Sequence, residues 1–144
     1  MSHRFSCLHK RSCRWRVPLV ALVALASCGG QPKEAPSAET QASVAACQCY
    51  EALYNGQLTT FLDSRVGAAE MSQEYRLQLL QAYQHHTAQV ERTHKGVRNV
   101  TANRAVMDTT LQLMQVFLMI DYNDGASEEV VVPMVESNGR WMLK

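Results

Sequence analysis

Hydrophobic and polar residues follow four successive patterns along the chain. A basic stretch and an apolar run occupy residues 1–27, and a stretch rich in Gly, Pro, Ser and Ala follows at 28–40. From residue 41 apolar residues recur every three or four positions, the spacing of one face of an α-helix. After Gly96 they alternate with polar residues, the spacing of a β-strand. The pattern therefore predicts a single domain, 41–144, of helices followed by strands.

Three helices are predicted, over residues 43–55, 58–64 and 72–92. Asn55-Gly56 is a typical C-terminal stop for the first, and Ser72 is a typical N-cap for the third. Glu74 lies in the first turn of the third helix, where a negative charge favours the helix dipole. This helix has the longest apolar stripe, so we expect it to be the main cover of the core. The stripe consists of Tyr75, Leu79, Ala82, Tyr83, His86 and Val90.

Four antiparallel strands in a meander are predicted, over residues 97–106, 109–122, 128–136 and 140–144. The turn signals Asn123-Asp124-Gly125 and Asn138-Gly139 separate the last three. Pro133 lacks a backbone donor, so we expect an edge position or a bulge there. Both faces of 109–122 are apolar in the middle, so a dimer partner, a curled sheet or the acyl-side surface must cover the second face. The predicted layout is α+β, with three N-terminal helices on a twisted four-stranded antiparallel sheet.

Residues 1–27 have the composition of an export signal. Five basic residues and no acidic one precede the apolar run 17–26, which is about half the roughly 20 residues that a membrane-spanning helix needs. Leu25-Ala26-Ser27-Cys28 resembles the lipobox of bacterial lipoproteins. The resemblance implies cleavage before Cys28 and acyl chains on its thiol and new amino group. The alternative is an ordinary secretory signal with an incidental cysteine.

Residues 28–40 have the composition of a flexible tether, because they contain too little apolar surface to form a core. Two or more acyl chains hold a protein stably on a membrane. We therefore expect a chain that is anchored to a membrane of the bacterial cell envelope and does not span it. Gly29 stands where an aspartate is associated with retention in the inner membrane, so the outer membrane is favoured.

The charge of the chain changes when the signal is removed. Five of the 14 basic residues precede Cys28 and all 13 acidic residues follow it, so nine basic residues face 13 acidic ones and the net charge becomes −4. No cluster of Lys and Arg remains, which excludes the electrostatic signature of a nucleic-acid-binding protein.

The cysteine and histidine pairs do not predict a metal site or a disulfide. Cys47 and Cys49 are two residues apart, which on a helix directs their thiols about 200° from each other. His85 and His86 are adjacent and have no ligand four residues away. Small core residues and a hydrogen-bonded His86 explain these pairs, and we predict no metal and no cofactor.

Two segments resemble the nuclear transport factor 2-like superfamily, also called cystatin-like, and its small bacterial lipoproteins with a domain of unknown function. Residues 49–57 resemble the end of that family's first helix, although Cys49 and Gln57 depart from its pattern. Residues 122–125 and 132–141 match its closing strand, Asp-Gly turn and Gly-Lys-Trp segment. The resemblance implies a cone in which helices and a curved sheet enclose a pocket. The superfamily contains isomerases, dehydratases, binding modules and dimerising adaptors, so the fold does not choose the function.

Two functions are therefore predicted. The favoured one is a non-enzymatic lipoprotein module that binds a small apolar ligand in the cone, or an envelope protein or second copy through the sheet face. The alternative is a pocket enzyme of isomerase or dehydratase type. Its base would be His86, its donors Tyr50, Tyr54 or Tyr83, and its carboxylates Asp63 and Asp121, although each tyrosine is equally explained by packing. The candidate pocket-lining residues are Tyr54, Phe61, Tyr83, His86, Phe117 and Trp141, of which Trp141 is alternatively a plug at the end of the sheet.

Overall fold

The computed structural model describes residues 35–144, which belong to one compact unit, Glu34–Lys144. The predicted signal, Cys28 and most of the predicted tether lie outside the described residues. Within residues 35–144, no helix has the length and hydropathy needed to cross a membrane. The elements are α1 (Ala38–Tyr54), α2 (Leu58–Asp63), the short 3-10 helix η1 (Ala68–Glu70), α3 (Gln73–His94), β1 (Val97–Asp108), β2 (Leu113–Tyr122), β3 (Ser127–Ser137) and β4 (Arg140–Leu143).

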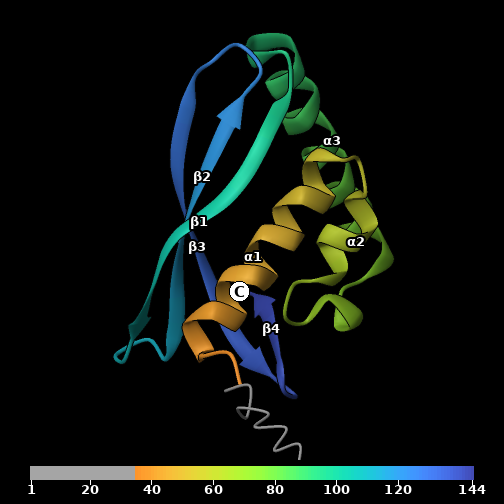
Figure 1. Cartoon of the computed structure of the whole chain (residues 1–144). Coiled ribbons are helices and arrows are strands. Elements are labelled where there is room, and N and C mark those ends of the chain that lie inside the picture. Colours follow the sequence, from red (N-terminus) through yellow and green to blue (C-terminus); the bar gives the residue numbers. More distant parts are fainter. Residues whose placement is uncertain (1–34) are drawn as a thin grey trace, which may run out of the picture. The chain divides into compact units, whose positions relative to one another are not determined.

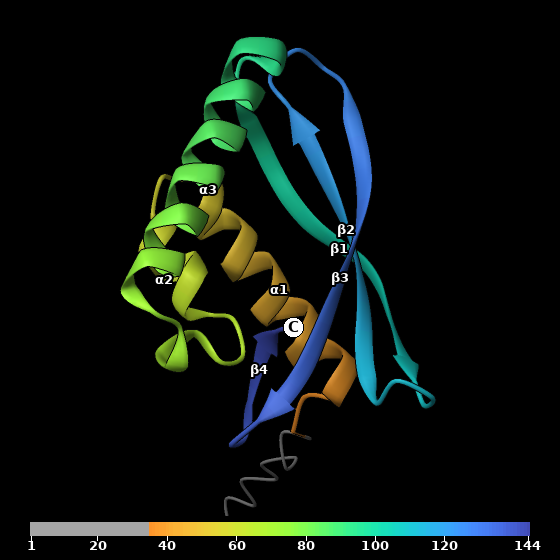
Figure 2. The same cartoon turned by 180° about the vertical axis from the view of Figure 1, so that it is seen from behind.

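The four strands form one antiparallel sheet in the order β1-β2-β3-β4. This confirms the predicted α+β layout and the meander. Figures 1 and 2 show β1, β2 and β3 as long strands that twist across one another, whereas β4 is short. β1 extends two residues beyond its predicted end, and the connecting turn lies at 109–112, because Asp108 accepts the backbone N–H groups of Thr110 and Leu111 at 3.0 Å.

Helix α1 begins at Ala38, so the predicted start at residue 43 is wrong. Ser37 is the N-cap, and its hydroxyl accepts the N–H of Thr40 at 3.3 Å. Glu39 adds a negative charge in the first turn, where it favours the helix dipole. The helix therefore includes the last three residues of the stretch 28–40. A local cap overrides the low hydrophobicity that made this segment resemble a tether.

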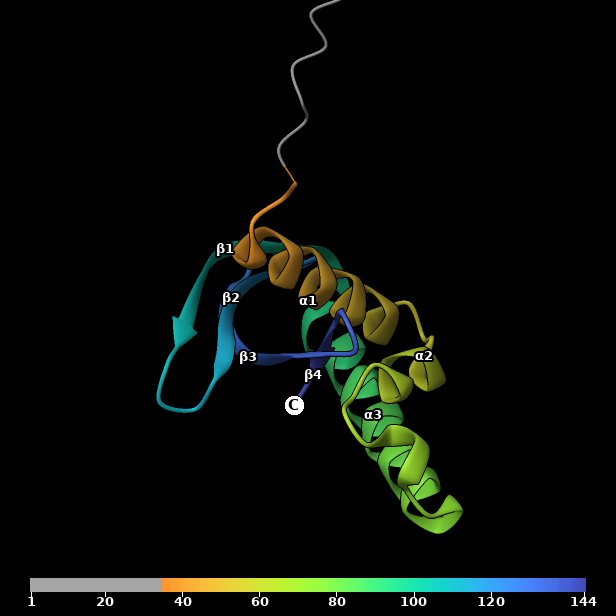
Figure 3. The same cartoon turned by 90° about the horizontal axis from the view of Figure 1, so that it is seen from below.

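Helix α1, and not α3, is the main cover of the sheet. It buries Ala42, Ala46, Cys49, Ala52 and Leu53, which recur every three or four residues. In α3 only Val90 is buried, while Tyr75 and Leu77 are 50% and 54% exposed. Figure 3 shows the N-terminal part of α3 extending away from the sheet. The expectation that α3 covers the core is therefore wrong.

The core-facing side of the sheet is formed by alternate residues of β2 and their neighbours. Met114, Val116, Leu118 and Ile120 are almost completely inaccessible to solvent. On the opposite face Phe117 and Met119 are half-buried. The Cζ atom of Arg104 lies 3.8 Å from the centroid of the Phe117 ring, so part of the second apolar face of β2 is covered by the chain itself.

Pro133 lies where β3 extends past the end of β4. Its carbonyl accepts the N–H of Lys144 at 3.1 Å, and in a strand the nitrogen and the carbonyl of one residue point to the same side. The missing donor of Pro133 therefore faces the end of β4 and removes no hydrogen bond to β2. This agrees with the predicted edge position.

The turn between β2 and β3 holds the C-terminal end of α3 in place. The Asp124 carboxylate accepts the N–H of Ala126 at 2.9 Å and lies 2.9 Å from Nδ1 of His94, whose ring stacks on Tyr122. The Asn123 side chain donates to the Lys95 carbonyl at 2.7 Å. The backbone hydrogen bond from Ala126, followed by the one from His94, lowers the pKa of Asp124 below its usual value of 3.8.

We predict that Leu118→Ala lowers the free energy of unfolding by about 2 to 5 kcal/mol, because it leaves a cavity in a fully buried site. Leu77→Ala on the exposed part of α3 is the matched control, and it should stay within about 0.5 kcal/mol. Urea unfolding followed by circular dichroism measures both. Equal losses for the two variants would contradict the assignment of the core to α1 and the sheet.

We predict that Asp124→Asn destabilises the protein near neutral pH and that this difference shrinks in acid. A carboxyl with a lowered pKa in the folded state stabilises above its unfolded pKa, and the stabilisation is lost as the pH falls through the folded value. Thermal unfolding of both proteins from pH 7 to pH 2 measures the difference. Glu136→Gln, at an exposed carboxylate of β3, is the control and should show no such trend. A difference that is independent of pH would contradict the prediction.

Candidate functional site

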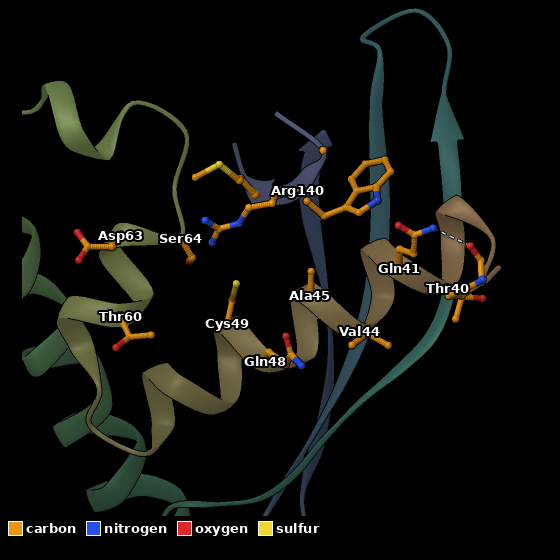
Figure 4. A pocket seen from close by; sticks show the side chains of 14 residues that line it. Thr40, Gln41, Val44, Ala45, Gln48, Cys49, Thr60, Asp63, Ser64 and Arg140 are labelled. Carbon is orange, nitrogen blue, oxygen red and sulfur yellow. Dashed lines mark hydrogen bonds between the residues drawn. The ribbon is translucent and has the colours of Figure 1, made fainter. Parts of the chain in front are cut away.

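An open groove of about 750 Å³ lies between the N-terminal half of α1, helix α2 and the hairpin that joins β3 to β4. Figure 4 shows Thr40, Gln41, Val44, Ala45 and Gln48 on the α1 side, opposite the hairpin. These residues lie on a flank of α1 beside the buried stripe that contacts the sheet. The groove is therefore formed by the side of α1 that the core leaves free.

The hairpin brings Arg140 and Trp141 to the groove. Asn138 and Gly139 have positive φ angles of 52° and 72°, the conformation of a tight two-residue turn that Asn-Gly favours. The chain between α2 and η1 is fastened to β4, because the N–H of Leu143 donates to the Ser64 carbonyl at 2.9 Å and the N–H of Val66 donates to the Leu143 carbonyl at 2.8 Å. The α2 side of the groove and the β3–β4 hairpin are therefore held to each other by backbone hydrogen bonds.

The walls are mainly apolar. Val44 is 51% exposed although it is a large hydrophobic residue, and Trp141 and Met142, which line the same groove, are half-buried. Thr40, Gln41, Gln48 and Thr60 add uncharged polar groups. An exposed valine next to a tryptophan in a concave surface is typical of a site that binds an apolar group.

Two charged side chains line the groove, and their surroundings differ. Asp63 forms an ion pair with Arg76 at 2.6 Å, and Arg76 also donates to the Ala68 carbonyl at 2.9 Å. Arg140 is exposed, and within residues 35–144 its guanidinium has no ion-pair or hydrogen-bond partner. The acidic group is neutralised and the basic group is not, so the groove has a positive character.

Besides two threonines, the groove contains the Cys49 thiol and the Ser64 hydroxyl, and neither of these two groups is arranged as an activated nucleophile. Burial raises the pKa of the Cys49 thiol above its usual value, only partly offset by a hydrogen bond with Ser64. The Ser64 hydroxyl donates to the Phe61 carbonyl at 2.6 Å. Burial and the negative charge of Glu51 raise the pKa of Cys47 too, and both cysteines are free thiols. An activated nucleophile needs a neighbouring base or a lowered pKa.

Most of the predicted pocket-lining residues form a packed aromatic cluster outside the groove. Phe61 packs edge to face on Tyr50 and Tyr83, with ring centroids 5.7 and 5.0 Å apart. Tyr54 Oη lies 3.5 Å from Nε2 of His86. Burial, followed by the neighbouring Tyr50 and Glu128, raises the pKa of Tyr54 to about 12, so this phenol stays protonated at neutral pH.

The other predicted site residues lie elsewhere. Trp141 lines the groove, whereas Phe117 lies beneath Arg104 on the opposite face of the sheet. Asp121 accepts the hydroxyl of Ser127 at 2.6 Å on that same face. Tyr54 also lines a second, smaller cavity of about 210 Å³ at the end of α1. The structure thus brings the predicted base His86 close to the predicted donor Tyr54, but it does not place the six pocket-lining residues around one cavity.

In residues 35–144 no group of three or more His, Cys, Asp or Glu side chains lies close enough together to hold a metal ion. The groove itself offers only two such side chains, Asp63 and Cys49.

No protein-family model matches the chain, and no curated protein matches it. A solved structure from Campylobacter jejuni, described as an NTF2-like transpeptidase, superposes with a TM-score of 0.56 at 14% sequence identity. The alignment covers 68% of this chain and 92% of that one. The chain has the NTF2-like fold. The likeness confirms the fold that was expected from segments 49–57 and 132–141. At 14% identity, it carries no information about activity.

Several residues that line the groove were not among the site residues predicted from the sequence. Val44, Gln48 and Arg140 line the groove. Val44 and Gln48 belong to no buried stripe or motif, and Arg140 belongs to the segment 132–141, which was predicted to be structural. The turn Asn138-Gly139 was the one sequence feature that could have indicated the hairpin side of the groove. It predicts that Arg140 and Trp141 begin a strand that pairs with the strand before the turn. Nothing in the sequence indicated that α1 would lie opposite that hairpin.

Proposed function

We propose that this protein is a lipid-anchored module of the bacterial cell envelope whose NTF2-like domain binds a small, mainly apolar ligand in the groove. The observation that carries the proposal is the groove itself, because its volume of about 750 Å³ lies within the roughly 300 to 1,000 Å³ of small-molecule sites. Val44 and Trp141 supply apolar walls, and a few uncharged polar groups lie at their margins. The space between α1 and the sheet holds buried core residues, so the groove is the better site.

The groups that line the groove favour binding over catalysis. Within residues 35–144, no hydrogen bond joins Ser64 or Cys49 to a basic group, and the Asp63 carboxylate forms an ion pair with Arg76. The Campylobacter jejuni protein is described as a transpeptidase. Among residues 35–144, the groove of the present chain contains no activated nucleophile that would support such an activity. An isomerase or dehydratase is less well supported because its predicted base His86 is exposed, and both His86 and its half-buried partner Tyr54 lie outside the groove.

The anchor of the proposed module is Cys28. The support for this part comes from the sequence: the basic and apolar stretches of 1–27, the small residues Ala26 and Ser27, and the polar stretch that follows. We infer cleavage before Cys28, acylation of Cys28 and attachment to the outer membrane. Helix α1 begins only ten residues after Cys28, so the tether we infer is shorter than the predicted 28–40.

We predict that Cys28→Ser abolishes acylation and releases the protein from the membrane fraction, because the acyl chains are attached through this cysteine. Metabolic labelling with a palmitate analogue and fractionation of the producing cells measure the two effects. Cys47→Ser, in a half-buried cysteine of α1, is the matched control and should remain labelled and membrane-bound. Membrane attachment of the Cys28→Ser protein would refute the anchor.

Ligand binding is tested by native mass spectrometry of the chain from residue 28 with Cys28→Ser, purified under gentle conditions from a bacterial host. We expect an additional small-molecule mass that Val44→Asp removes, because a carboxylate on the groove wall disfavours an apolar ligand. Val66→Asp is the control, since Val66 is 43% exposed outside the groove. An additional mass that is unaffected by Val44→Asp, or no additional mass at all, would count against the groove as the binding site.

The predicted homodimer through the sheet face is a second proposal. Val106 and Val131 are exposed on that face beside Phe117 and Met119, although Arg104 covers part of it. Sedimentation equilibrium of the same chain at high micromolar concentration should show a dimer that Val131→Lys weakens by introducing an unpaired charge. A monomer at that concentration would exclude the homodimer.

A further inference from the structure

The unpartnered guanidinium of Arg140 restricts the kind of ligand that fits the groove. Figure 4 shows its side chain extending across the groove toward Ser64 and α2. Asp63, the carboxylate on that side, is already paired with Arg76. Glu136, which pairs with Trp141 across the hairpin, forms no ion pair with Arg140. Among residues 35–144, the groove therefore combines an apolar wall with the positive charge of Arg140, which has no ion-pair partner there.

A planar guanidinium donates two parallel hydrogen bonds to a carboxylate, which gives both affinity and orientation. The apolar residues Val44, Ala45 and Met142 have no side-chain hydrogen-bond donor, so their surface suits an alkyl chain. A ligand that satisfies both parts has an apolar body and an anionic group at one end. A purely apolar ligand would leave the Arg140 charge without a partner beside it.

The groove also lies at the end of the described unit where the tether enters. Pro36 lines the groove, and the side-chain amide of Gln41 donates a hydrogen bond to the Pro36 carbonyl at 2.6 Å. Pro36 is the eighth residue after Cys28, and eight extended residues span at most about 29 Å. With Cys28 acylated, as proposed, the Pro36 edge of the groove lies within that distance of the membrane surface.

We propose that the groove binds a fatty-acid-like ligand, with the alkyl chain along Val44 and Trp141 and the carboxylate on Arg140. This inference rests on the proposed function of the groove as a ligand site, and it adds the chemical class of the ligand. Arg140 is then the residue that selects an anion over a neutral or cationic amphiphile of the same length.

The test uses the chain from residue 28 with Cys28→Ser, in which Trp141 is the only tryptophan and so reports on the groove directly. Dodecanoate, dodecanol and dodecyltrimethylammonium are titrated below their aggregation limits at pH 8, and the fluorescence of Trp141 is recorded. We expect saturable binding of dodecanoate that is about tenfold or more tighter than that of dodecanol, and weakest binding of the cation.

Arg140→Gln should weaken dodecanoate binding about tenfold and leave dodecanol binding unchanged. Arg140→Lys, which keeps the charge without the planar fork, should retain a smaller preference for dodecanoate. Arg92→Gln on α3 is the matched control and should change neither affinity. Circular dichroism and thermal unfolding should be the same for all three variants, because Arg140 and Arg92 are exposed.

The outcomes separate this inference from the proposed function. Equal affinities for dodecanoate and dodecanol that Arg140→Gln does not change would overturn the anionic ligand and leave an apolar binding site. No saturable change in Trp141 fluorescence with any of the three probes would overturn both. A tenfold loss in Arg92→Gln as well would show a general effect of protein charge and would also overturn the assignment to Arg140.

Discussion

The close packing of α1 against the sheet is the contact on which the rest of the domain depends. Ala42 and Ala46 are completely buried, and such small side chains let the helix backbone approach the strands closely. The large residues of the interface come from the other side, where Met114, Val116 and Leu118 of β2 point at the helix. Because α1 covers the sheet alone along most of its length, α3 can extend away and bury only Val90. The other flank of α1 then remains free to form a groove wall.

The groove depends on contacts between segments that are distant in the sequence. Arg65, just after α2, forms a bridge with Leu143 of β4, and the Arg65 guanidinium donates to the Lys144 carbonyl at 3.0 Å. These contacts fasten the end of the chain to the α2 region, with the β3–β4 hairpin opposite α1. A short β4 is sufficient for this, and it leaves most of β3 as a free edge. The position of Pro133 is compatible with that edge because the sheet needs no donor there.

The sequence predicts the order and type of the main elements well because periodicity is a local property. The alternation of 113–122 and the turns at 123–125 and 138–139 define the strands without any knowledge of the tertiary fold. Burial is not local, and the prediction for α3 is wrong for that reason. Tyr75 and His86 belong to an apolar stripe in the sequence but are exposed in the structure, whereas the alanines of α1 give a weak signal. The aromatic residues of the predicted pocket are likewise brought close together, but Phe61 and the tyrosines fill the space with their own rings.

This division between buried and exposed positions explains why the fold and the function must be argued separately. The residues that hold α1 on the sheet are small or apolar, and many sequences meet that requirement, which agrees with a shared fold at 14% identity. Val44 and Arg140 take no part in the core, so the packing of the domain places no demand on their chemistry. Val44 is 51% exposed, and within residues 35–144 the Arg140 guanidinium forms no ion pair. Their chemistry therefore bears on the ligand proposed for the groove and not on the fold.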